Sequence, residues 1–121
     1  MQYEFKIIAF TNDPQFSILL TRECDKYGFM LTFIDNINEI KEELDDSIIS
    51  VAILDLNETS LNPFDLCVDI KKEYGLPVFG VLQKFGKQVQ EKAKKHGFDL
   101  IFTKKMLIRS IREVVIHVSN E

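Results

Sequence analysis

Ionisable side chains stand directly after two of the apolar runs in this chain. Asp55 follows the apolar run 49–54, and Lys104 follows the short run "DLIFT". A carboxylate is costly to desolvate unless it is paired with a cation or lies at the open end of a strand. We therefore expect Asp55 either to pair with Lys104, the lysine at a neighbouring strand end, or to carry out chemistry there.

The ends of two other apolar runs carry different residues. The first apolar run, 5–10, leads into Thr11, Asn12 and Asp13, and the fourth run ends at Leu82. Asp13 precedes Pro14, and an acid followed by proline is a usual start of a helix, with the acid as the N-cap. We expect the Asp13 carboxylate to be occupied by hydrogen bonds from N–H groups of that helix.

Five strand–helix units are predicted to position these residues. Strands are predicted over 5–10, 29–34, 49–54, 76–82 and 99–103, and helices over 14–27, 38–44, 63–74, 87–96 and 106–118. Strands that are apolar throughout, each followed by a helix, are typical of a parallel sheet buried on both faces. Right-handed crossovers then give one doubly wound α/β domain over 1–121, with functional groups at the carboxyl ends of its strands.

The composition suits a single globular domain. The chain has 121 residues, of which 45% are hydrophobic and 28% charged, as is ordinary for such a domain. No run approaches the roughly 18 apolar residues that cross a membrane, and "MQYEFKIIAF" lacks the features of a secretory signal. Cys24 and Cys67 fall in predicted helices, which favours buried reduced thiols. We expect a cytoplasmic protein.

With these elements in place, the chain resembles a response-regulator receiver domain of the CheY-like superfamily over its whole length. The resemblance rests on the five units, on Asp55 closing the third strand, and on the segments "GLPVFGVL" and "HGFDLIFTKKM". It implies a flavodoxin-like (βα)5 fold with strand order 2-1-3-4-5. It also implies a role in two-component signal transduction, within a phosphorelay.

The resemblance also assigns roles to individual positions. In that family an aspartate accepts a phosphoryl group from a histidine kinase, two carboxylates after the first strand hold Mg²⁺, and a lysine contacts the phosphoryl group. Carried over by position, Asp55 is the candidate phosphoacceptor and Lys104 the matching lysine. Asn57 would offer its backbone carbonyl to a metal.

Several positions depart from the family pattern. Thr11 and Asn12 occupy the places of the two carboxylates, Asp13 is displaced by one residue, and Leu82 occupies the place of a hydroxyl residue that follows the phosphoryl group. Mg²⁺ prefers carboxylate oxygen, and Asp55 with two neutral neighbours offers a formal charge of about −1 where three carboxylates would offer about −3. These losses should weaken the metal site.

The departures favour a pseudo-receiver, which acts through protein contacts and in which Mg²⁺-dependent aspartyl phosphorylation is weakened or lost. We expect no enzymatic activity and no cofactor, or at most weak Mg²⁺ binding through Asp55, Asp13 and Asn57.

The alternative is a working receiver, phosphorylated at Asp55 by a histidine kinase, that recruits Asp13 after a small loop shift. A third interpretation is an unrelated flavodoxin-like module, although "TNDPQF" has no glycine for a phosphate-binding loop.

A basic segment indicates the kind of partner. The net charge is −4, yet residues 84–105 hold seven lysines against two acids. In receivers the fourth helix, fifth strand and fifth helix form the usual output face, which predicts docking on an acidic signalling protein, either a kinase or an output partner. The candidate face consists of Lys87, Lys92, Lys94, Lys95 and Lys105. A solvated helix face is the alternative, and the acidic net charge argues against nucleic acid.

The last predicted helix is apolar beyond a single stripe. Leu107, Val114 and Ile116 flank a predicted core line of Ile108, Ile111, Val115 and Val118. Extra apolar width on a terminal helix suits a packed edge, and it also suits a homodimer or a partner contact.

Overall fold

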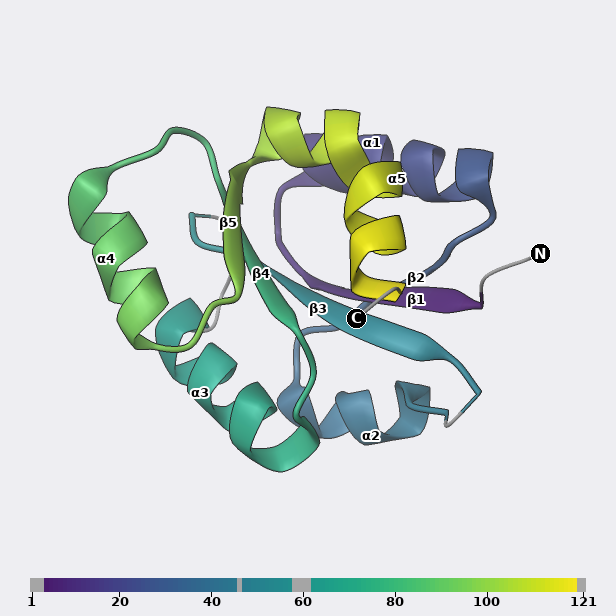
Figure 1. Ribbon diagram of the computed structural model, residues 1–121, viewed down its shortest axis with the longest axis horizontal. Helices are drawn as coiled ribbons and strands as arrows, with labels where there is room; N and C mark the ends of the chain where they lie inside the picture. Colours follow the sequence, from purple (N-terminus) through teal and green to yellow (C-terminus); the bar gives the residue numbers. More distant parts are fainter. Residues whose placement is uncertain (1–3, 46, 58–61, 120–121) are drawn as a thin grey trace.

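Five parallel strands form one sheet through the middle of the computed structural model (Figure 1). They are β1 (Phe5–Phe10), β2 (Met30–Phe33), β3 (Ile49–Asp55), β4 (Val78–Leu82) and β5 (Leu100–Thr103), in the order β2-β1-β3-β4-β5. The structure describes residues 4–45, 47–57 and 62–119. Both the doubly wound α/β class and the strand order expected from the resemblance are confirmed.

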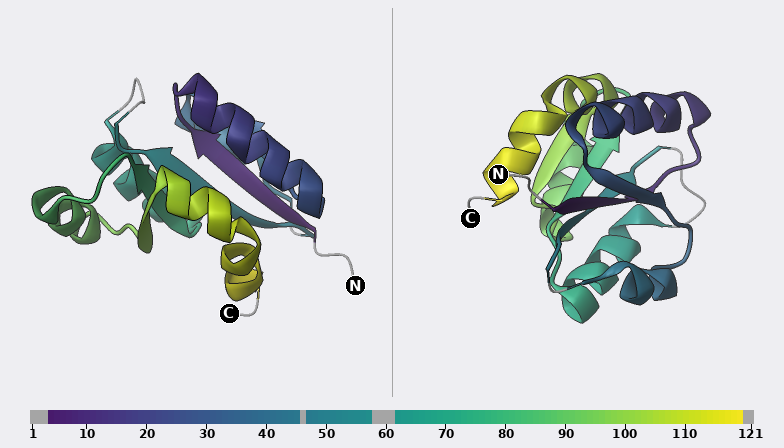
Figure 2. Two further views of the ribbon diagram at one scale, coloured as in Figure 1. Left: turned by 90° about the horizontal axis from the view of Figure 1, so that it is seen from above. Right: turned by 90° about the vertical axis from the view of Figure 1, so that its right-hand side faces the viewer.

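Helices cover both faces of this sheet (Figures 1 and 2). One face carries α1 (Pro14–Tyr27) and α5 (Lys104–Ser119), which contact each other. The other face carries α2 (Ile40–Glu43), α3 (Pro63–Tyr74) and α4 (Lys87–Lys95), and a 3₁₀ turn, η1 (Ile37–Glu39), leads into α2. None of the helices in the described ranges is both long and apolar enough to cross a membrane.

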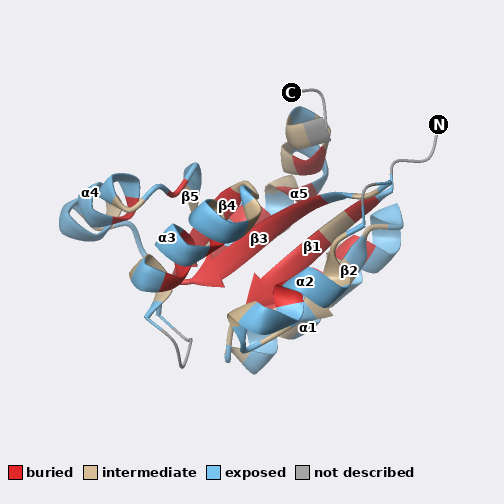
Figure 3. Ribbon diagram, turned by 90° about the horizontal axis from the view of Figure 1, so that it is seen from below, coloured by how far each residue is buried: buried red, intermediate tan, exposed pale blue. Residues whose placement is uncertain are grey.

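The central strands are buried because each of their faces meets a helical layer, as Figure 3 shows for β1 and β3. Ile7 packs with Leu20 of α1 and Ile111 of α5 in one apolar cluster. Ile8, one residue further along β1, packs with Ile70 of α3 in the other cluster. Successive side chains of a strand point to opposite faces, so an unbroken apolar run is what a sheet with two covered faces requires.

The ends of α1 and α3 match the predicted ranges 14–27 and 63–74, and local residues cap them. Asn62 and Pro63 start α3, with Phe64 N–H donating to Asn62 Oδ1 at 3.0 Å. Gly28 and Gly75 end α1 and α3 in the left-handed conformation, with φ of 73° and 64°, which glycine adopts without strain. These signals therefore set where the long helices lie relative to the strand ends.

Several boundaries differ from the prediction, most of them by one or two residues. The second strand is shorter, Met30–Phe33, and the predicted helix 38–44 is a 3₁₀ turn followed by one turn of α-helix. The last helix begins at Lys104, two residues earlier than predicted, and Thr103 Oγ1 accepts a hydrogen bond from Met106 N–H at 3.1 Å at this end.

The packing of the last helix also corrects the predicted core line. Leu107, predicted as a flanking residue, is 0% exposed and lies in the core with Ile111 and Val115. Ile108 and Val118, predicted within the line, are only partly buried against that core. The contacts of the helix with α1, β4 and β5 decide which stripe is buried.

Candidate functional site

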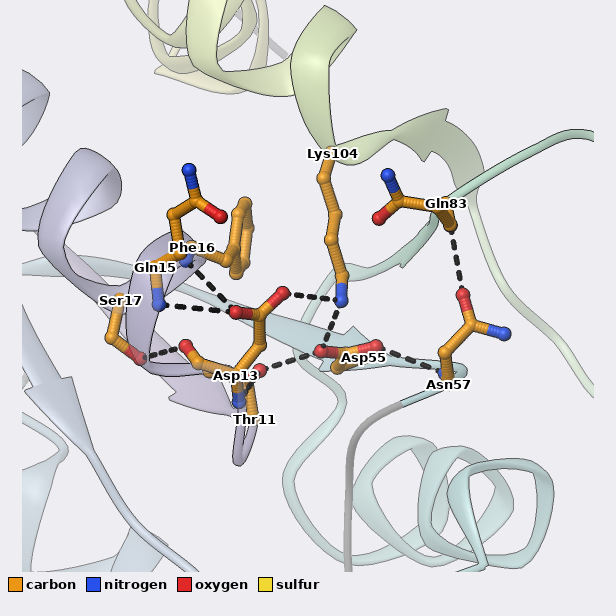
Figure 4. Close-up of polar contacts among 9 residues, drawn as sticks. All are labelled: Thr11, Asp13, Gln15, Phe16, Ser17, Asp55, Asn57, Gln83 and Lys104. Carbon is orange, nitrogen blue, oxygen red and sulfur yellow. Dashed lines mark hydrogen bonds and ion pairs between the residues drawn. The ribbon is translucent and has the colours of Figure 1, made fainter.

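Asp55 is the last residue of β3, between β1 and β4, and its side chain is fully buried. Its Oδ1 accepts a hydrogen bond from Asn57 N–H at 2.9 Å. Its Oδ2 accepts one from Thr11 Oγ1 at 2.6 Å and lies 2.9 Å from Lys104 Nζ. Both carboxylate oxygens therefore have donors, as a buried charge requires (Figure 4).

Lys104 joins two carboxylates. Its Nζ lies 2.9 Å from Asp55 Oδ2 and 2.9 Å from Asp13 Oδ2, and the residue is only 8% exposed. Burial acts to lower the pKa of Lys104, but the hydrogen bonds and charges of Asp55 and Asp13 outweigh burial and raise the pKa above its usual value. The pairing with Asp55 expected from the sequence is present, and the ammonium stays charged.

The two carboxylate oxygens of Asp13 make different contacts. Oδ1 accepts hydrogen bonds from the N–H groups of Gln15 and Phe16 at 3.1 and 3.2 Å and so caps α1. Oδ2 accepts a hydrogen bond from Lys104, and this bond, followed by that from Phe16 N–H, lowers the pKa of Asp13. The expectation that the cap would occupy this carboxylate holds for one oxygen only, because the other oxygen faces Lys104.

The two positions of the expected acidic pair behave differently. Thr11 Oγ1 donates to Asp55 Oδ2 and accepts from Asp13 N–H at 3.1 Å, so its hydroxyl joins the network. Asn12 is exposed. Thr11 was predicted only as the site of a lost carboxylate, although a hydroxyl at a strand end can donate to a neighbouring acid.

Gln83, which follows β4, joins the site although it was not among the predicted site residues. Leu82 ends β4 and is 2% exposed, with no polar atom in its side chain. Gln83, the next residue, donates its N–H to Asn57 Oδ1 at 2.8 Å. This bond ties the segment after β3 to the segment after β4. Asn57 thus uses its backbone N–H on Asp55 and its side chain on Gln83.

These contacts form one connected site with two carboxylates, one ammonium and one hydroxyl (Figure 4). Its formal charge is −1, from Asp13 and Asp55 against Lys104. Within the described ranges, no cluster of three or more His, Cys, Asp or Glu side chains could hold a metal ion. Lys104 Nζ lies at the point that the two carboxylates share, 2.9 Å from one oxygen of each.

The lysines of the candidate partner face are all exposed. Lys87, Lys94 and Lys95 lie on α4, which projects at one end of the sheet (Figure 1), and Lys105 lies on α5. Lys92 Nζ lies 4.4 Å from the centroid of the Phe64 ring of α3, a cation–π distance. Lys92 therefore also contributes to the contact between α4 and α3.

Comparisons with known proteins define the fold. No family model matches the chain, and no curated protein matches it. The BeF₃-activated receiver domain of RstA from Klebsiella pneumoniae is similar, with a TM-score of 0.72 at 16% identity, covering 93% of this chain and 97% of that one. The signal receiver domain of a DNA-binding response regulator from Colwellia psychrerythraea matches with a TM-score of 0.71 at 19% identity, covering 93% and 99%.

A third structure agrees with these two. The CheY-like response regulator receiver domain protein from Methanospirillum hungatei has a TM-score of 0.71 at 12% identity, with 98% of both chains covered. The chain thus has the CheY-like fold of response-regulator receiver domains over nearly its whole length. At these identities the similarity describes the fold.

Proposed function

We propose that this chain is a receiver-type signalling module that acts by contact with other proteins and not by catalysis, with Mg²⁺-dependent phosphorylation at Asp55 weakened or lost. The observation that carries the proposal is the arrangement around Asp55 Oδ2. This oxygen receives the Thr11 hydroxyl at 2.6 Å and the Lys104 ammonium at 2.9 Å. The Asp55 carboxylate is therefore already paired with a cation and hydrogen-bonded.

The chemistry of phosphoryl transfer supports this proposal. Transfer to a carboxylate depends on cations that offset the charge on the transferring oxygens. Here Asp13 and Asp55 share a single ammonium, and the hydroxyl of Thr11 adds no negative charge to attract a dication. Leu82 offers no hydroxyl to a phosphoryl group, so a phosphorylated Asp55 would lack one means of shifting the neighbouring loop.

The partner follows from charge. The lysine face on α4 and α5 suits an acidic signalling protein, either a kinase or an output partner, and exposed apolar residues lie on the same elements. Val89 of α4 is 38% exposed and Met106 of α5 is 44% exposed. Apolar contacts ringed by lysines give both area and charge complementarity. A homodimer through α5 would use the same surface.

A working receiver is the second candidate, favoured by one observation. Asp13 Oδ2 faces the site and lies 2.9 Å from the same ammonium as Asp55 Oδ2. If Lys104 moved away, two carboxylate oxygens would flank one position, and Asp13 would substitute for the missing acidic pair. This candidate requires Asp55 to accept a phosphoryl group.

A Mg²⁺ titration separates the two candidates. We expect amide NMR signals of residues 11–13 and 55–57 in the wild-type protein to show no saturable shift up to about 10 mM Mg²⁺, which means a dissociation constant weaker than that. The Thr11→Asp/Asn12→Asp double variant restores the acidic pair and should bind Mg²⁺ at least about tenfold more tightly. Asp55→Asn in that background should remove the binding.

The same samples test phosphorylation. Incubated with Mg²⁺ and acetyl phosphate or beryllofluoride, the wild-type protein should show neither the mass of one added phosphoryl group nor shifts around Asp55. A mass increase in the wild-type protein that Asp55→Asn abolishes would replace the pseudo-receiver proposal with the working receiver.

A further inference from the structure

A pocket of about 280 Å³ opens between α1 and α5, beside the Asp55 site. It shares Asp13 and Lys104 with that site. Its remaining wall comes from Gln83, which follows β4, and from the first two turns of α1 and α5, which lie side by side (Figure 1). This volume is below the usual range for drug-sized ligands and suits a compound with a single ring or a short chain.

The charges around the pocket favour an anion. Lys104, Lys105 and Arg109 line it against one carboxylate, Asp13, which gives a formal excess of two positive charges. Lys104 is paired with Asp13 and Asp55. Lys105 and Arg109 are exposed, stand one helical turn apart on α5, and make no ion pair with any residue in the described part of the chain. Two cations at this spacing can bind one anionic group together.

Apart from the amides of Gln15 and Gln83, the rest of the wall is apolar. Phe16 is buried beneath the pocket, Leu19 is 38% exposed at its rim, and Ile108 is partly buried on the α5 side. Cations at one side and an apolar wall at the other match a molecule with a charged head and an apolar body. A purely inorganic anion would leave the apolar wall uncovered.

We propose that this pocket binds a small organic anion, with a carboxylate or phosphate head held by Lys105 and Arg109 and an apolar ring or chain packed on Leu19 and Ile108. The ligand would lie against Lys104 and Asp13, so its binding gives the signalling module an input that needs no phosphoryl transfer. The inference stands whether or not Asp55 is phosphorylated, because Lys105, Arg109, Leu19 and Ile108 would hold the ligand, while only Lys104 and Asp13 are shared with the Asp55 site.

Phenylphosphonate is a suitable probe, because its carbon–phosphorus bond prevents transfer of the phosphoryl group to Asp55. With the whole chain, we expect saturable amide NMR shifts at residues 15–19 and 105–109, with a dissociation constant of about 1 mM or tighter. Methylphosphonate, which lacks the ring, and benzyl alcohol, which lacks the charge, should each bind at least about threefold more weakly. Equal shifts from methylphosphonate, or no saturable shift from phenylphosphonate, would overturn the proposal.

Two matched pairs of variants locate the binding. Arg109→Gln and Leu19→Gln should each weaken phenylphosphonate binding by about threefold or more. Their neighbours Arg112 and Ile18 are also exposed but do not line the pocket, so Arg112→Gln and Ile18→Gln should leave the dissociation constant unchanged. If each control weakened binding as much as its partner, the ligand would lie elsewhere and the proposal would fail. All four positions are exposed, so the variants should fold.

Discussion

At the scale of single residues, the site depends on how one buried carboxylate is neutralised. Asp55 is 0% exposed, and it is tolerated because Thr11, Asn57 N–H and Lys104 all donate to it. Removing one partner from a buried pair leaves an uncompensated charge, whereas replacing both by neutral groups does not. The pair can therefore be tested by comparing single and double variants.

Lys104→Met should lower the free energy of unfolding by about 3 kcal/mol, because Asp55 would keep its charge without its cation. The Asp55→Asn/Lys104→Met double variant should recover at least half of that loss. Urea unfolding followed by circular dichroism measures both. Lys105→Met, at the exposed neighbour of Lys104, is the control and should change the stability by less than about 0.5 kcal/mol. A double variant as unstable as Lys104→Met would contradict the pairing.

Asp13 should make stability depend on pH. Its pKa is lowered in the folded protein, chiefly by the hydrogen bond from Lys104, so its charged form stabilises the fold. That contribution is complete above the unfolded-state pKa of about 4 and is lost as the pH falls through the lower folded-state pKa. Asp13→Asn keeps an N-cap residue but removes the charge. The gap in urea midpoint between wild type and variant should close on acidification, and a constant gap from pH 7 to about pH 2 would disprove the assignment.

At the scale of elements, β4 and β5 are placed by a close approach at Gly80. A Cβ added at Gly80 would lie 2.8 Å from Ile101 Cδ1 and 3.1 Å from the ring of Phe98. These two side chains belong to the cluster that packs α3 and α4 against the sheet. Because β4 and β5 end at Leu82 and Thr103, this contact helps to fix where Lys104 begins α5.

Gly80→Ala should destabilise the protein by about 1–3 kcal/mol through overpacking. Ile101→Val removes the Cδ1 atom that the new methyl group would meet, so it should be stabilising in the Gly80→Ala background. In the wild-type background the same change should cost about 1 kcal/mol. Urea unfolding of the four proteins measures this change of sign, and strictly additive effects would show that the clash is relieved elsewhere.

The helix ends show which parts of an element can be predicted locally. The helix bounds 14–27 and 63–74 were predicted correctly, because the caps at Asp13, Gly28, Asn62 and Gly75 involve only neighbouring residues. The start of α5 was predicted two residues late. Two lysines are unfavourable at the positive end of a helix, and only the distant carboxylates of Asp13 and Asp55 make Lys104 acceptable there.

At the scale of the whole molecule, one sheet separates two apolar cores that share its strands. Leu20 of α1 lies in one core and Ile70 of α3 in the other, and both are 0% exposed. Because β1 and β3 contribute to both cores, loss of either helical layer exposes the sheet that the other layer needs. The two layers should therefore unfold together.

Leu20→Ala and Ile70→Ala test this coupling. Each should lower the free energy of unfolding by about 2–5 kcal/mol through the cavity that it leaves. Each variant should keep one transition, with far-ultraviolet and near-ultraviolet circular dichroism coinciding along the urea axis. Exposed Val68→Ala on α3 is the control, with a change of less than about 0.5 kcal/mol. Two separated transitions in either variant would contradict the coupling.

The sequence by itself determined the five strand–helix units, the parallel sheet and the position of Asp55 at the end of its third strand. These follow from the period of apolar residues and from local caps, which depend on neighbours in the chain. The tertiary structure decided how the strand ends meet: that Asp13 turns one oxygen toward Lys104, that Thr11 donates to Asp55, and that α1 and α5 leave a cationic pocket between them. Those contacts join residues up to 91 positions apart, and their geometry is set by packing across the sheet, which no local pattern encodes.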